Sequence, residues 1–186
     1  IYAGISGHKK TLAKTTGSNS ILINENGTEI PLLRNGTATV LEQIKIIRKA
    51  AKNNADVVII ESMALRPELQ KIESNKLIRP TIHVLSNIRP DHVDVMGSDN
   101  SKIAKSYHDS IYKNAQLITT KETVDKLGDT SFFPNLPTIG SLAQIEIQKI
   151  QKKLDYIEHD ENIELAFSTC RSLGIEKEQV QTKFLF

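Results

Sequence analysis

Three short stretches of the chain have aliphatic centres and are rich in β-branched residues: residues 55–62 (ADVVIIES), 81–88 (TIHVLSNI) and 115–122 (AQLITTKE). None of them alternates apolar with polar positions, so each is predicted to be a strand that is buried on both faces. Strands of this kind are typical of a parallel sheet that is covered by helices. We therefore expect the strands at 57–61 and 82–87 to lie in one mostly parallel sheet flanked by helices.

Segments with helical periodicity separate these strands. Helices are predicted at residues 39–55, 101–115, 141–154 and 162–175, the last of them ended by Gly174. In the first helix the stripe expected to face the core is Leu41, Ile44, Ile47 and Ala51. Strands and helices that alternate along the chain with short connections indicate an α/β domain.

The first forty residues follow a different pattern. Residues 20–33 (SILINENGTEIPLL) predict a β-hairpin that turns at Asn26–Gly27. Residues 131–140 (SFFPNLPTIG) predict a loop. A chain of 186 residues and 20.8 kDa suits a single domain that covers residues 1–186.

Composition narrows the class of protein. The formal net charge of +2 is too small to favour a nucleic-acid partner, and no basic run is interleaved with aromatic residues. The single cysteine, Cys170, excludes an internal disulfide and lies in a predicted helix, where we expect it to be a small core residue. No stretch reaches the roughly 20 apolar residues that a membrane helix needs.

Polar residues follow two of the predicted strands. Glu61 ends the strand VVII, and an acid at the carboxyl end of a strand is how many nucleotide hydrolases hold magnesium. Asp91 and His92, in NIRPDHVDVMG, follow the next strand and would lie near Glu61 if the two strands are neighbours. Histidine is an unusual magnesium ligand, so a metal site and a simple polar turn both remain open.

Thr15, Thr16 and Gly17 lie in the segment AKTTGSNS and supply two hydroxyl groups and a permissive backbone. Such a loop can line a phosphate site, although Thr–Gly pairs are also common in ordinary turns. The phosphate-loop pattern G-x-x-x-x-G-K-[ST] does not occur in the sequence.

The order of five motifs resembles a known family. AKTTG, LEQ, IIESMALRPELQ, NIRPDHVDVMG and IAKSYHDSIYKNA follow one another as in the ligase subunit of poly-γ-glutamate synthase, the PgsB/CapB type of capsule protein in the Mur-ligase superfamily. The resemblance covers roughly residues 3–122 and resumes at NIELAFSTCRSLGIEKE. It implies the central, ATPase-like α/β domain of a Mur-type ligase.

The resemblance also implies an activity and a site. Members of the superfamily use ATP and Mg²⁺ to phosphorylate a carboxylate, which an amino group then attacks; here the product would be a γ-linked glutamate polymer for a capsule. Glu61 and His92 match magnesium ligands, and Asp91 would orient the second of them. The positions that would face the nucleotide are Thr15, Thr16, Gly17 and Asn162, the last of which would contact adenine.

Several expectations concern what lies beyond this sequence. The phosphate loop of the family would precede Ile1 and its C-terminal domain would follow Phe186, so we expect these residues alone to be inactive. The implied substrate is glutamate or poly-γ-glutamate. The implied partners are the membrane subunits of a capsule synthase complex, and the implied location is the cytoplasmic face of the bacterial membrane, with the anchor absent from this chain. No lysine clearly matches the carbamylated lysine of many superfamily members.

Two other classes of function compete with the ligase. The chain could belong to a non-catalytic subunit that organises a membrane capsule-synthesis complex, or it could be a nucleotide-sensing module. Glu61 and His92 favour the enzyme over the organising subunit, because an organising subunit needs neither residue.

Overall fold

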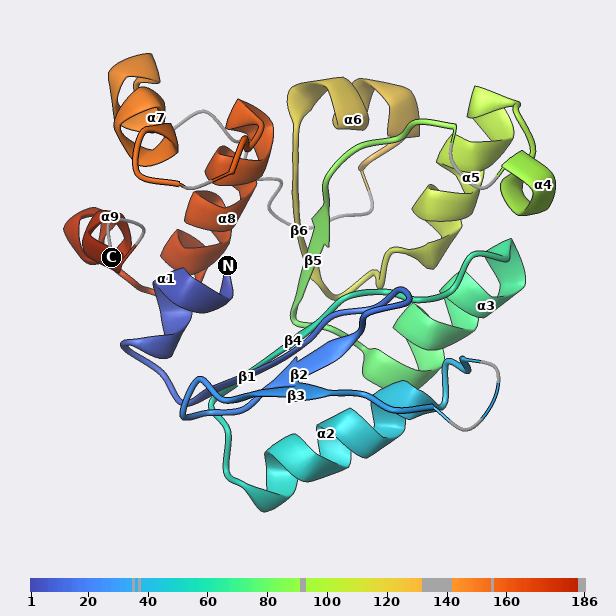
Figure 1. The fold of residues 1–186 in the computed structure, drawn as a ribbon. Coiled ribbons are helices and arrows are strands. Elements are labelled where there is room, and N and C mark those ends of the chain that lie inside the picture. The colour runs from blue at the N-terminus through green and yellow to red at the C-terminus, as the bar shows by residue number, and fades with distance from the viewer. Residues whose placement is uncertain (35, 37, 91–92, 132–141, 155, 184–186) are drawn as a thin grey trace.

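Two β-sheets form the centre of the fold (Figure 1). The computed structural model describes residues 1–34, 36, 38–90, 93–131, 142–154 and 156–183. The first sheet has the order β3–β2–β1–β4 and the second pairs β5 with β6. The strands are β1 (Thr11–Lys14), β2 (Ile21–Ile23), β3 (Glu29–Pro31), β4 (Val57–Ile60), β5 (Ile82–Leu85) and β6 (Gln116–Thr119).

The first sheet is mixed. β1 pairs with β4 in parallel and with β2 in antiparallel orientation, and β2 pairs with β3 in antiparallel orientation. β2 and β3 form the predicted hairpin, whose turn is closed by the Gly27 N–H donating to the Asn24 carbonyl over 2.9 Å. Gly27 has a φ of +82°, a left-handed conformation that glycine adopts without strain. The hairpin therefore extends the sheet on the free side of β1.

The strands predicted at 55–62, 81–88 and 115–122 are present as β4, β5 and β6, and they alternate with helices as an α/β protein requires. The expectation that β4 and β5 share one mostly parallel sheet is wrong. β4 pairs with β1, whereas β5 pairs in parallel with β6 in a separate sheet. The prediction that these strands are buried on both faces is also only partly confirmed, because β4 is half-buried along its whole length and β5 is buried only at Leu85. An aliphatic run does not report which strand lies beside it.

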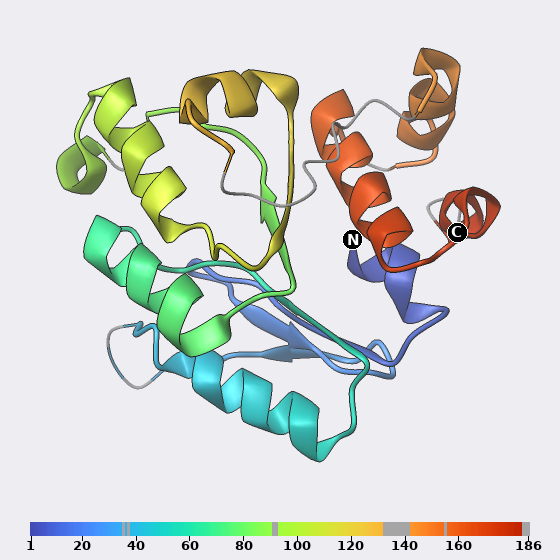
Figure 2. The same ribbon diagram turned by 180° about the vertical axis from the view of Figure 1, so that it is seen from behind.

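Helices cover both sheets. α2 (Glu42–Lys52) lies under the first sheet, α3 (Pro67–Ile72) continues into the π-helix η1 (Glu73–Ile78), and α5 (Asn100–Ser110) packs on α3 and α6 (Lys121–Leu127) (Figures 1 and 2). The remaining helices in the described residues are α1 (Tyr2–Ser6), α4 (Val93–Met96), α7 (Gln144–Gln151), α8 (Asp160–Ser172) and α9 (Lys177–Lys183). Of these, α1, α7, α8 and α9 form a group on the side opposite α5, in which α8 contacts β5 and β6 and α1 contacts β1.

The buried stripe of α2 is shifted by one residue toward the N-terminus relative to the predicted stripe. The side chains that face the core are Gln43, Ile46 and Ala50, whereas Leu41 is 57% exposed. Gln43 turns inward because its amide group makes two hydrogen bonds to buried partners. A polar contact therefore sets the rotation of this helix, and apolar periodicity alone does not reveal it.

The largest apolar cluster surrounds Phe167 of α8. Phe167 is 1% exposed and packs with Ile5, Ile150 and Ile163. Cys170 belongs to the same cluster and is fully buried, which confirms that it is a small core residue. Among the helices in the described part of the chain, none is both long and apolar enough to span a membrane.

We predict that Phe167→Ala lowers the free energy of unfolding by about 3–5 kcal/mol, because it removes a ring from a closed apolar cluster and leaves a cavity. Leu33→Ala is the matched control, since Leu33 is 92% exposed and should change stability little. Urea denaturation followed by circular dichroism measures both changes. Equal effects of the two substitutions would contradict the role assigned to this cluster.

Candidate functional site

Glu61 lies at the point where the parallel strands β1 and β4 end together. The pairing of Lys14 with Ile60 brings the segment after β1 beside the segment after β4, and the Glu61 N–H donates to the Lys14 carbonyl over 3.0 Å. The Glu61 side chain then accepts a hydrogen bond from the Thr16 N–H, with 2.6 Å between Oε2 and N. The structure thus brings Glu61 and the Thr15–Gly17 loop together at the carboxyl edge of the first sheet.

The loop itself is tied to β2. The Thr15 N–H donates to the Ile21 carbonyl, and the Ile21 N–H donates to Thr15 Oγ1, both over 2.9 Å. The Thr15 hydroxyl therefore already serves as an acceptor within the fold, although its own proton remains available as a donor. Gly17 is exposed and has a φ of +87°, where a side chain would strain the backbone.

A partly buried ion network adjoins the loop. The Lys14 ammonium is fully buried and lies 3.0 Å from Glu42 Oε1. Arg34 donates to both oxygens of the same carboxylate, from Nε over 2.8 Å and from Nη2 over 3.0 Å, and its Nη1 donates to the Gly17 carbonyl over 3.0 Å. Arg34 therefore joins the loop to the first turn of α2.

These cations change the chemistry of Glu42. The hydrogen bonds from Arg34, together with those from Lys14, outweigh the effect of burial and lower the pKa of Glu42 to about 2. Glu42 is thus ionised throughout the neutral range, and its side chain is only 16% exposed. The sequence analysis assigned no role to these three residues, although Lys14 and Glu42 fall within the motifs AKTTG and LEQ. Their interaction joins segments that are far apart in the chain, so no local pattern reveals it.

The oxygen atoms at this edge suit magnesium. Mg²⁺ prefers carboxylate and hydroxyl oxygens and is commonly held by one or two protein carboxylates together with substrate phosphates. Glu61 supplies an exposed carboxylate that accepts from the Thr16 N–H, and the same loop carries the hydroxyl groups of Thr15 and Thr16. Within the described ranges, no group of three or more histidine, cysteine, aspartate or glutamate side chains could hold a metal ion. The predicted residues Asp91 and His92 lie outside the described residues.

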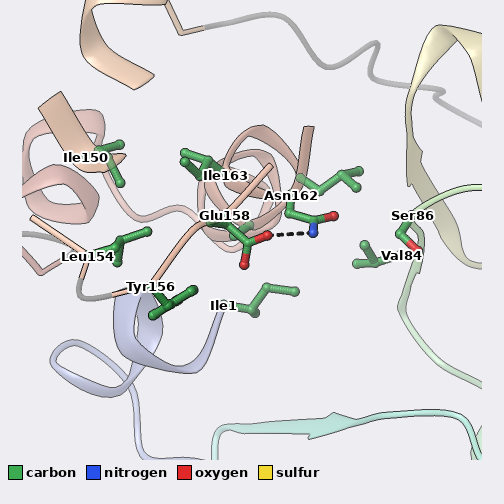
Figure 3. Close-up of a pocket in the computed structure, with 11 residues that line it drawn as sticks. Ile1, Val84, Ser86, Ile150, Leu154, Tyr156, Glu158, Asn162 and Ile163 are labelled. Carbon is green, nitrogen blue, oxygen red and sulfur yellow. Dashed lines mark hydrogen bonds between the residues drawn. The ribbon is translucent and has the colours of Figure 1, made fainter. Parts of the chain in front are cut away.

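Asn162 occupies a different place, in the first turn of α8. It is exposed, and its Nδ2 donates to Glu158 Oε1 over 2.8 Å. Both residues line a cavity of about 280 Å³ that also contacts Val84 and Ser86 at the end of β5 (Figure 3). The side chains of Ile150, Leu154 and Ile163 make much of its wall apolar.

A second, more polar cavity of about 380 Å³ adjoins Asn162. Asn87 and Arg89 line it on one side, and residues 158–161 line it on the other. Asn87 and Arg89 lie in the segment that leads from β5 to Asp91 and His92. The predicted site residues therefore fall into two groups, Glu61 with Thr15, Thr16 and Gly17 at the first sheet, and Asn162 near the end of β5. No hydrogen bond or ion pair between described residues joins the two groups.

Comparison with known proteins identifies two relatives. The chain is 30% identical over 172 residues to the capsule biosynthesis protein CapB of Bacillus anthracis, an alignment that covers 91% of this chain and 37% of that protein. It is 28% identical over 172 residues to the PGA synthase CapB of Bacillus subtilis (strain 168), covering 91% of this chain and 44% of that protein. The chain thus spans less than half the length of either relative. No family model and no solved structure matches it significantly. The similarity confirms the resemblance to CapB-type capsule proteins that the order of motifs indicated.

The ion network predicts a specific dependence of stability on pH. The folded pKa of Glu42, about 2, lies below the value of 4.5 for a free glutamate, so its contribution is complete above pH 4.5 and is lost as the pH falls toward 2. We expect Glu42→Gln to lower the free energy of unfolding at pH 7 by about 3 kcal/mol.

Urea titrations between pH 7 and pH 3 measure the free energy of unfolding of the wild type and of Glu42→Gln. The difference between the two proteins should become smaller below about pH 4.5. Glu68→Gln, a change at an exposed glutamate of α3, is the matched control and should cost little at any pH. A gap between wild type and Glu42→Gln that stays constant down to pH 3 would contradict the assignment.

Proposed function

We propose, from its relationship with the CapB-type capsule proteins, that the chain is the central ATP-binding part of an ATP-dependent amide ligase. The proposed product is a γ-linked glutamate polymer for a capsule. The names of the two relatives, a capsule biosynthesis protein and a PGA synthase, support a role in making a capsule polymer. The proposal includes the Mur-ligase relationship and a single ATP-binding domain over residues 1–186, although β4 and β5 lie in separate sheets.

One observation carries the proposal: the Glu61 carboxylate lies against the Thr16 amide at the shared carboxyl end of two parallel strands. Ligands of α/β proteins bind preferentially beyond this edge. An exposed carboxylate bonded to a loop that carries two hydroxyl groups and a glycine suits a magnesium–phosphate complex better than it suits an apolar ligand. Glu61 and the Thr15–Gly17 loop also fall within the motifs that the chain shares with the family.

The proposed reaction has two steps. The γ-carboxylate of glutamate attacks the terminal phosphorus of ATP, which forms an acyl phosphate and releases ADP. The amino group of a second glutamate then attacks the acyl carbon, so that an amide bond forms, phosphate leaves and the amine loses a proton. Bound Mg²⁺ would neutralise the repulsion between the carboxylate and the triphosphate.

The residues take separate roles in this proposal. Glu61 would bind Mg²⁺, and the Thr15–Gly17 loop would face the phosphates. His92 would be a second metal ligand that Asp91 orients, on the basis of the sequence motif alone. Asn162 would contact adenine, and the partly apolar cavity beside it supports this role because a purine ring needs apolar walls.

The proposal also covers the setting of the enzyme. We propose that the intact protein acts on glutamate or poly-γ-glutamate at the cytoplasmic face of a bacterial membrane, together with membrane subunits of a capsule synthase complex. The names of the two relatives, which refer to capsule biosynthesis and to a PGA synthase, support the capsule part of this proposal.

We predict that Glu61→Gln in the intact protein lowers the rate of glutamate-dependent ADP release about a hundredfold or more, because a neutral amide holds Mg²⁺ poorly. His92→Ala should act in the same direction. A coupled assay of ADP with and without glutamate, or glutamate oligomers, measures both effects. Glu68→Gln is the matched control, since it changes an exposed glutamate seven residues further along the chain.

Two results would contradict the proposal. ADP release by the wild type that does not depend on glutamate or its oligomers would exclude the ligase reaction. Glu61→Gln and His92→Ala proteins that still restore capsule synthesis in a strain lacking the gene would instead favour a non-catalytic subunit that organises the synthesis complex.

A further inference from the structure

A buried carboxylate lies directly behind the turn that follows β4. Glu73, the first residue of the π-helix η1, is 1% exposed. Its two oxygens accept four hydrogen bonds, from Gln43 Nε2 over 2.7 Å, Ser62 Oγ over 2.5 Å, the Met63 N–H over 3.2 Å and the Ala64 N–H over 3.3 Å. Three of the four donors belong to the residues that come immediately after Glu61.

Gln43 connects this carboxylate to Glu61 itself. The same Nε2 that donates to Glu73 also donates to the Glu61 carbonyl over 3.1 Å. Gln43 is fully buried in α2, so its amide group is fixed by the packing of that helix. The backbone from Glu61 to Ala64 is therefore held from one side by a single connected pair of side chains, Gln43 and Glu73.

Stability alone does not account for this arrangement. Glu73 forms no ion pair with any described residue, and its four partners are neutral donors. The nearby His83 does not supply a charge at neutral pH, because burial lowers its pKa to about 4. A carboxylate buried among neutral groups costs free energy that an apolar side chain of similar size would avoid. π-Helical turns such as the one that carries Glu73 occur frequently at functional sites.

We propose that Gln43 and Glu73 are positioning residues that hold the Glu61 carboxylate against the Thr16 amide and so set the affinity of the site for Mg²⁺ in the presence of ATP. The geometric part of the proposal, that the two residues position Glu61, is argued from the hydrogen bonds alone. The magnesium part rests on the proposed function. Neither residue contacts the reacting groups; each acts through the backbone and orientation of Glu61.

The Thr16 N–H reports directly on the geometry, because it donates to Glu61 Oε2 over 2.6 Å. We predict that Gln43→Leu and Glu73→Gln each speed hydrogen exchange of this amide about tenfold, the factor that corresponds to the loss of one hydrogen bond. Nuclear magnetic resonance of the full chain labelled with ¹⁵N-threonine measures the exchange. Glu61→Ala removes the acceptor and gives the upper limit of the effect.

The second readout is a calorimetric titration of Mg²⁺ into the intact protein at a fixed ATP concentration. We expect both variants to weaken Mg²⁺ binding about tenfold. Gln70→Glu is the matched control for both readouts. Gln70 is also a buried glutamine that donates to a backbone carbonyl, that of Leu65, and accepts from a serine, Ser106, but it makes no hydrogen bond to Glu61 or Glu73. The control should lose stability without changing either readout.

The outcomes separate the two proposals. Unchanged Thr16 exchange in folded Gln43→Leu and Glu73→Gln proteins would overturn the positioning role. Faster Thr16 exchange with no Mg²⁺-dependent ATP binding, even in the wild type, would reject the proposed function and the magnesium part while the geometric part stands. If either buried variant fails to fold, Ser62→Ala removes one bond to Glu73 from an exposed residue. It should speed Thr16 exchange to a smaller extent, and no change there would likewise overturn the role.

Discussion

The parallel pairing of β1 with β4 is the constraint on which the candidate site depends. Each strand has only four residues, yet their register places Lys14 beside Ile60 and makes both strands end at the same level. The chain then leaves β1 as the Thr15–Gly17 loop and leaves β4 at Glu61. A shift of one residue in this register would turn the side chains of one strand to the opposite face, and would separate the loop from the carboxylate.

Two carboxylates, the half-buried Glu42 and the fully buried Glu73, hold the segments that form this edge, and they do so by different physical means. Glu42 is surrounded by Lys14 and Arg34, so the attraction between opposite charges fixes it to β1 and to the loop. Glu73 has only neutral donors, so the directionality of hydrogen bonds fixes the turn after β4. The first arrangement joins the end of β1 to the first turn of α2, and the second fixes the path of the backbone that follows β4.

The sequence predicted those features that depend on local patterns. Continuous aliphatic runs located β4, β5 and β6, and Asn26–Gly27 located the hairpin turn, because burial and turn geometry leave marks at neighbouring positions. β1 was not predicted, since its residues TLAK include a threonine and a lysine whose burial is explained only by partners far along the chain. The division into two sheets was also missed, because pairing depends on distant segments.

The candidate site was predictable to a similar degree. The position of Glu61 at a strand end indicated that it lies at the sheet edge where ligands bind, and the motif AKTTG indicated the loop. Neither pattern showed that the Thr16 N–H would donate to Glu61. Gln43 and Glu73 are separated by 30 residues, and although Gln43 belongs to the motif LEQ, neither residue's position in the sequence showed that it would be buried. Their role comes from tertiary packing, which turns a polar position of α2 toward the interior.

The contact between Arg34, Glu42 and Lys14 limits how this protein can change during evolution. If Glu42 is replaced first, a buried ammonium and a guanidinium are left facing each other without a counter-charge, which is costly for a protein of ordinary stability. If Lys14 is replaced first by an apolar residue, Glu42 keeps Arg34 as its partner. Substitutions at these positions are therefore accessible in one order and not in the other, so descendants of this sequence would lose the lysine before they lose the glutamate.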